Sequence, residues 1–440
     1  MTWGCASGNN SGGKGGSGGS AGSGGSAQIG GSGGSGLGGT SASGGSKTGG
    51  SASGGTTTAS GGVTSDGGKA SGGVTSSGGG SGGGGETGGA GGAPPTLPTL
   101  AEGWNEFDPG GETICAFGTP YAFFARPGKV NKLIVDFIGG GGCWDALTCS
   151  MVDDFFYAEV DSVPLRFAIP PDNVPHGIYD HTRAENPFAD WYHVVVPYCT
   201  GDLHWGDSVA TYGEGTANQV TINHKGAVNV RAVLKWVYDN FSAPEQILVS
   251  GCSAGSYGSA LWSADVMNHY PNAEVFQFGD SGAGIMSEGF FADSWNIEAA
   301  LPAYIPELDP SKVDIHTMTM SDVYAGIANH FPKQKMSQYS AIRDEEQVYY
   351  FIWVGGTDAQ EFSRLLQASW AEIEQRAPNF ASFLAPGEQH GILSDDNFYT
   401  VRSNGVALVD WLRGMVEKTS FHSVACQGAE CEQPTPDQQP

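Results

Sequence analysis

The chain has 440 residues, 71 of them Gly, and a formal net charge of −26 with only 15% charged residues. Residues 1–95 are mostly Gly, Ser, Ala and Thr. Such a segment cannot bury enough apolar surface to offset the entropy lost on folding, so we predict a disordered Gly/Ser-rich linker. The acidic balance argues against nucleic-acid binding. No run of 18 or more apolar residues predicts a transmembrane span.

Cys5 stands just before this linker, in Trp3-Gly4-Cys5-Ala6-Ser7. The arrangement is typical of a bacterial lipoprotein, in which a lipidated Cys tethers a domain through a Gly/Ser spacer. The apolar segment that should precede such a Cys is missing. We therefore expect an earlier start site and a lipid tether through Cys5.

The remaining sequence predicts one catalytic domain over residues 102–420 and a polar tail over 427–440. Short apolar runs alternate with helical patterns, which indicates a mostly parallel α/β sheet flanked by helices. In chain order we expect a hairpin over 112–126; strands at 132–138, 193–197, 246–250, 274–278, 336–342, 349–354 and 381–384; and helices at 224–240, 256–268, 321–330, 358–377 and 405–417.

Seven of the cysteines lie in this domain. Close spacing suggests disulfides between Cys143 and Cys149 and between Cys426 and Cys431. A bond between Cys115 and Cys199 is also possible, which would leave Cys252 as a buried free thiol. Such pairing implies an oxidising compartment. The sequence has no CxxC spacing that would indicate a zinc or redox motif.

The segment Gly251-Cys252-Ser253-Ala254-Gly255 fits G-x-S-x-G between a predicted strand and a predicted helix. Such a turn exposes the Ser hydroxyl at a helix N-terminus, where backbone N–H groups and the helix dipole favour an oxyanion. We expect Ser253 to be a nucleophile; a tight turn with no catalytic role is the alternative. Ser281, in Gly279-Asp280-Ser281-Gly282, is expected in a loop that borders the site.

The Gly-rich segment 139–142 follows another strand and can turn backbone N–H groups into a cavity, as an oxyanion hole requires. A general base and an acid should follow the nucleophile in the order Ser, Asp, His. His390 is our candidate base because it lies in a loop directly after a predicted strand. Asp344 and Asp358 both follow predicted strands, and spacing does not separate them as the acid.

Taken together, these motifs resemble the pectin acetylesterase family, which includes plant enzymes, the animal carboxylesterase Notum and bacterial proteins. The resemblance spans most of residues 112–415. The resemblance rests on the following residues: Phe137-Ile138-Gly139-Gly140-Gly141-Gly142-Cys143-Trp144 with Cys149, Asn186-Pro187-Phe188, Val196-Pro197-Tyr198-Cys199-Thr200-Gly201-Asp202, Gly251-Cys252-Ser253-Ala254-Gly255 and His390.

The resemblance implies an α/β-hydrolase-like fold and a Ser-His-Asp triad that acts through an acyl-enzyme. It implies Ser253 as nucleophile, His390 as base and Asp344 as acid, because Asp344-Glu345-Glu346-Gln347 matches the family pattern better than the surroundings of Asp358. The implied oxyanion donors are the backbone N–H groups of Gly140, Gly141 and Ala254, and Cys143–Cys149 matches a family disulfide.

This reading predicts a secreted or cell-surface serine carboxylesterase that needs no metal or organic cofactor. Its expected substrate is an acylated polysaccharide or another ester, with O-acetyl as the first expectation. One alternative is a deacylase for long-chain or lipid acyl groups. Another is an inactive hydrolase fold that serves as a glycan-binding surface module. Gly141 and Gly142 stand where some family members have bulky residues. This difference changes the lining of the acyl pocket, so the sequence does not predict which acyl group the protein accepts.

Overall fold

A computed structural model describes residues 97–160, 174–287, 289–291 and 295–434. A nine-stranded sheet forms the centre, in the order β1-β2-β4-β3-β7-β8-β9-β10-β13. It is parallel from β4 to β13, and β2 pairs antiparallel with both β1 and β4. Its strands are β1 (Asn105–Phe107), β2 (Phe123–Arg126), β3 (Lys132–Phe137), β4 (Tyr192–Val196), β7 (Gln246–Cys252), β8 (Glu274–Asp280), β9 (Lys335–Ala341), β10 (Phe380–Ala385) and β13 (Val424–Ala425).

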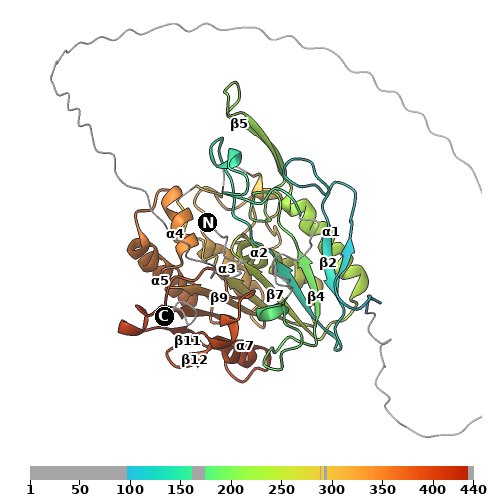
Figure 1. Cartoon of the computed structure of the whole chain (residues 1–440), viewed down its shortest axis with the longest axis vertical. Coiled ribbons are helices and arrows are strands. Elements are labelled where there is room, and N and C mark those ends of the chain that lie inside the picture. Colours follow the sequence, from blue (N-terminus) through green and yellow to red (C-terminus); the bar gives the residue numbers. More distant parts are fainter. Residues whose placement is uncertain (1–96, 161–173, 288, 292–294, 435–440) are drawn as a thin grey trace, which may run out of the picture. The chain divides into compact units, whose positions relative to one another are not determined.

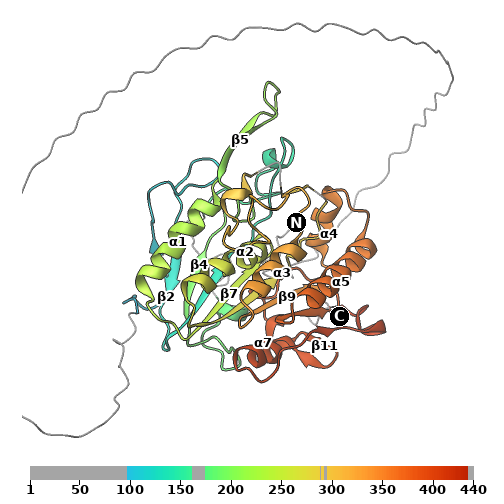
Figure 2. The ribbon, with the colours of Figure 1, turned by 180° about the vertical axis from the view of Figure 1, so that it is seen from behind.

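Helices lie on both faces of this sheet (Figures 1 and 2). Short antiparallel pairs, β5 with β6 and β11 with β12, lie outside it, and the first of these projects from the body in Figure 1. The helices are α1 (Gly226–Asn240), α2 (Ala254–His269), α3 (Met320–His330), α4 (Glu345–Trp353), α5 (Ala359–Arg376), α6 (Asn397–Thr400) and α7 (Leu408–Val416); the short strands are β5 (Ser208–Tyr212), β6 (Val220–His224), β11 (Arg402–Ser403) and β12 (Val406–Ala407).

The central strands are buried on both faces, which explains their nearly continuous apolar sequence. Alternate side chains of β3 enter different cores: Val135 packs on the side of α1, α2, α3 and α5, whereas Ile134 packs on the side of α7. Figure 2 shows α1, α2, α3 and α5 along one face. The predicted fold class, a mostly parallel sheet flanked by helices, is confirmed.

Two predicted elements were wrong. Residues 349–353 belong to the helix α4 and not to a strand, and Val354 is the C-cap of this helix. The aromatic run Tyr-Tyr-Phe-Ile-Trp is apolar on every side, so its periodicity did not separate strand from helix. The expected hairpin over 112–126 also fails, since within that stretch the structure has only the strand β2, and its partners are β1 and β4.

Three disulfides join Cys115 to Cys199, Cys143 to Cys149 and Cys426 to Cys431; the last two are the close pairs that spacing suggested, and the first is the bond given as possible. The prediction of a free thiol at Cys252 was wrong, because this residue is disulfide-bonded too. The predicted linker over 1–95, including Cys5, lies outside the described residues. Among the described helices, none is long and apolar enough to cross a bilayer.

Candidate active site

The candidate nucleophile stands on a strained turn between β7 and α2. Ser253 has φ 56° and ψ −124°, a region that few residues other than Gly adopt. The flanking glycines are required by close backbone packing: a Cβ on Gly251 would lie 2.1 Å from the Gly255 carbonyl oxygen, and one on Gly255 would lie 1.9 Å from that of Phe137. The G-x-S-x-G spacing therefore reflects the backbone path that presents the Ser253 side chain to the cavity.

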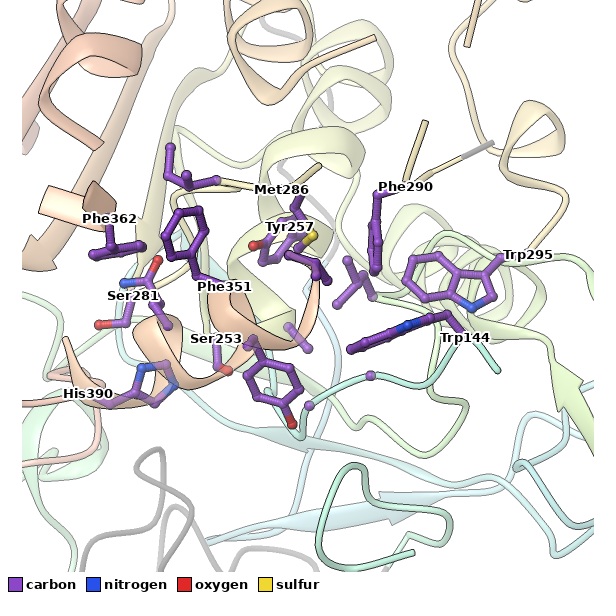
Figure 3. Close-up of a pocket in the computed structure, with 18 residues that line it drawn as sticks. Trp144, Ser253, Tyr257, Ser281, Met286, Phe290, Trp295, Phe351, Phe362 and His390 are labelled. Carbon is purple, nitrogen blue, oxygen red and sulfur yellow. The ribbon is translucent and has the colours of Figure 1, made fainter. Parts of the chain in front are cut away.

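His390 follows β10 in a loop, and its ring is buried. Nδ1 lies 2.8 Å from Oδ1 of Asp344, which is fully buried. This contact leaves Nε2 for the cavity, which both His390 and Ser253 line (Figure 3). Burial lowers the pKa of His390, but the nearby Asp344 carboxylate outweighs that effect and raises the pKa to about 9.

Asp344 is held by the helix that it begins. Its side chain caps α4 by accepting from the backbone N–H of Gln347 at 2.9 Å, and the Gln347 side-chain amide donates to the other carboxylate oxygen at 2.9 Å. Asp358, the competing candidate, is an exposed N-cap of α5 and bonds to Gln360 and Glu361. The structure thus places Asp344, and not Asp358, against His390.

Hydrogen bonds hold the Gly-rich loop, residues 139–142, on both sides of Gly141. Gly142 donates its N–H to the carbonyl oxygen of Phe155 at 3.1 Å, and Tyr157 donates to that of Gly140 at 3.0 Å. Within the described part of the chain, no hydrogen bond uses the N–H of Gly140, Gly141 or Ala254. Gly141 and Ala254 line the same cavity as Ser253. The amides of Gly141 and Ala254 are thus available for an oxyanion at this cavity, whereas Gly140 is not among the residues that line it.

The cavity next to these groups is lined mostly by apolar and aromatic side chains. Figure 3 shows Trp144, Phe290 and Trp295 together on one side and Ser281 with His390 on another. The sequence predicted that the loop with Ser281 borders the site but did not predict most of the wall, whose residues come from several loops and from α2, α4 and α5. The lining comprises Gly141, Gly142, Trp144, Leu203, Ser253, Ala254, Tyr257, Ser281, Ile285, Met286, Phe290, Trp295, Gln347, Tyr350, Phe351, Val354, Phe362 and His390.

Cys143 and Cys149, joined in a disulfide, lie beyond the Gly-rich loop. Of the residues that the structure describes, these two and His224 are the one group close enough to share a metal ion. A disulfide offers no thiolate to a metal, so the group does not fit a metal centre. The backbone carbonyl of Cys143 accepts from the Trp295 indole at 2.9 Å, which ties the disulfide to the cavity wall.

Residues 110–300 match the sequence model of the pectinacetylesterase family. The match confirms the resemblance read from the motifs, and the enzymes of that family are carboxylic ester hydrolases. No curated protein matches the chain. Among solved structures it is similar to the Wnt deacylase Notum from Drosophila in two crystal forms, with 18% identity in each. One gives a TM-score of 0.52 over 73% of this chain and 95% of that chain, the other 0.49 over 74% and 94%. At this identity the likeness concerns the fold.

Proposed function

We propose that this chain, whose residues 110–300 match the pectinacetylesterase family model, is a serine carboxylesterase with Ser253, His390 and Asp344 as its triad. The observation that carries the proposal is the buried 2.8 Å contact between His390 and Asp344 at the cavity that Ser253 lines. A nucleophile, a base within the same cavity and a third group that orients the base are the parts that acyl transfer needs.

In the proposed mechanism, Nε2 of His390 takes the proton from the Ser253 hydroxyl as its oxygen attacks the ester carbonyl. Asp344 accepts the Nδ1–H bond, which fixes the imidazole tautomer and stabilises the imidazolium that forms. The N–H groups of Gly140, Gly141 and Ala254 bind the oxyanion of the tetrahedral intermediate. The alcohol leaves with the proton from His390, and water then hydrolyses the acyl-enzyme by the same sequence of proton transfers. These steps need no metal or organic cofactor.

The proposed substrate is an O-acylated glycan, with O-acetyl as the first candidate from the family match. The cavity favours a second candidate, a longer acyl chain. Its wall is mostly apolar and aromatic, as a site for an alkyl chain would be. Such a pocket gains about 0.8 kcal/mol for each CH₂ group that it buries. The acyl chain length is therefore the property to measure.

The proposed location is secreted or tethered at the cell surface. The described disulfides fit an oxidising compartment. In this proposal residues 102–420 form the catalytic domain, residues 1–95 are a spacer with a lipid tether at Cys5, and residues 427–440 are a tail. Radiolabelled fatty acid incorporated by the wild-type chain and not by a Cys5→Ala variant would support the tether, and equal labelling would refute it.

Hydrolysis of p-nitrophenyl esters from acetate to octanoate, by the full chain and by Ser253→Ala, tests the enzyme assignment. We expect the wild type to hydrolyse these esters. The variant should lose nearly all activity while its midpoint of thermal unfolding stays unchanged. Rates that fall with chain length would favour the acetylesterase, and rates that rise would favour the longer-chain deacylase. A wild type that is folded but inactive on every ester, and unreactive with an organophosphonate, would instead indicate the glycan-binding module.

A further inference from the structure

Two buried polar residues at the end of β8, Asp280 and Ser281, lie between the elements of the candidate triad. Asp280 is fully buried and Ser281 is 1% exposed. Ser281 has a φ of 54°, a conformation that is costly for a residue with a side chain. The mechanism above uses neither residue. Ser281 nevertheless lines the cavity with Ser253 and His390 (Figure 3).

The side chains of these two residues bind the backbone directly after His390. Ser281 Oγ accepts from the N–H of Gly391 at 2.9 Å. One carboxylate oxygen of Asp280 accepts from the N–H groups of Ile392 and Leu393, at 2.8 and 2.9 Å. The other accepts from the hydroxyl of Ser281 at 2.9 Å. Three consecutive amides of the loop that carries His390 are therefore fixed by two adjacent side chains.

The backbone of the same two residues is bonded to the other parts of the site. The carbonyl oxygen of Asp280 accepts from the N–H of Ser253 at 2.8 Å, within the strained turn. The N–H of Ser281 donates to the carbonyl oxygen of Tyr339 at 2.9 Å, on β9, the strand that leads to Asp344. One short segment thus holds the nucleophile turn by its backbone and the base loop by its side chains.

We propose that Asp280 and Ser281 form a clamp that positions His390 relative to Ser253. The inference rests on the proposed function and adds two positioning residues to it. A carboxylate suits the role because charge-assisted bonds to backbone N–H groups are roughly twice as strong as neutral ones. Positioning matters because a misplacement of about 1 Å can reduce the rate about 10²-fold.

The charge of Asp280 also acts on His390. Burial raises the pKa of Asp280 to about 6, although its hydrogen bonds oppose this effect. The acidic groups that face His390 and favour its charged form are Asp344, Glu346 and Asp280, in that order of effect. Loss of the Asp280 charge should therefore lower the pKa of His390, which provides a readout that a purely structural residue would not move.

The test compares Asp280→Ala with Asn379→Ala in the full chain. Asn379 is also buried and also makes three hydrogen bonds to backbone groups, but it precedes β10 and so lies at the opposite end of the strand from His390. Both variants should lower the urea midpoint. Measured below its unfolding transition, Asp280→Ala should lose about 10²-fold in kcat with little change in KM. Asn379→Ala should keep the wild-type kcat.

Two milder variants keep the proposal testable if Asp280→Ala does not fold. Asp280→Asn keeps the shape and one acceptor oxygen, so it should retain more activity than Asp280→Ala and shift the pH midpoint of kcat/KM downward. Ser281→Ala should lower kcat because the Gly391 amide loses its acceptor. A wild-type kcat in Ser281→Ala together with an unshifted pH profile in Asp280→Asn would overturn the clamp. A wild type without esterase activity would overturn the proposed function instead.

Discussion

Replacement of Gly141 by Ala should remove one oxyanion donor from its position. Gly141 has a φ of 71°, and a Cβ on it would lie 2.0 Å from the carbonyl oxygen of Phe155 and 2.3 Å from the Tyr350 hydroxyl. The Phe155 carbonyl accepts both from the N–H of Gly142 and from the Tyr350 hydroxyl, so it cannot yield without breaking other bonds. The loop must therefore shift and carry the Gly141 amide with it.

The expected size follows from two costs. A non-Gly residue in the left-handed region costs about 1–2 kcal/mol, and the contact with Phe155 adds to this loss of stability. Removal of one oxyanion donor costs on the order of 10²–10³ in kcat. The assay is steady-state hydrolysis of a p-nitrophenyl ester by Gly141→Ala, below the unfolding transition located by urea denaturation.

Gly142→Ala is the matched control. Gly142 has no positive φ, and its Cβ would make an ordinary contact of 3.6 Å with Leu203. This variant should stay near the wild type in stability and change kcat by only a few fold. A Gly141→Ala protein with wild-type kcat, or a Gly142→Ala protein that is equally impaired, would refute the reasoning about the loop.

Three further predictions concern the base, the loop and the acyl pocket. Because Asp344 raises the pKa of His390 to about 9, kcat/KM should rise with pH to a midpoint above 6.5. A pH–rate profile with its midpoint at or below 6.5 would contradict this prediction. Asp344→Asn should lose on the order of 10⁴-fold in kcat. Replacing both Cys143 and Cys149 by Ser should lower kcat through a looser Gly-rich loop, and an unchanged kcat with only a lower thermal midpoint would refute that link. Phe290→Ala enlarges the cavity beside Trp144, so the octanoate-to-acetate rate ratio should increase; a ratio that stays equal to the wild type would show that the acyl chain does not reach this wall.

The sequence was sufficient for the parts of the site that depend on local backbone geometry. The G-x-S-x-G turn needs glycine at close backbone contacts, so Gly251 and Gly255 mark it without any tertiary information. The central strands are buried on both faces and are recognisable as short apolar runs. His390 could be selected because a catalytic base in this kind of sheet follows a strand.

Features that depend on tertiary contacts could not be read in this way. Asp344 and Asp358 both begin helices, so local pattern does not separate them; the family resemblance favours Asp344, and the contact with the His390 loop is a tertiary one. The local sequence likewise does not predict that the Gln347 side chain binds Asp344. Residues 349–353 of α4 predicted a strand because all five are apolar or aromatic: some of them line the cavity and others pack on Phe155.

The most direct test of the central claim is the identity of the residue that an organophosphonate ester modifies, located by peptide mass spectrometry of the full chain. The account predicts a single adduct on Ser253 that is lost in His390→Ala. An adduct on Ser281, or labelling of Ser253 that does not depend on His390, would contradict it.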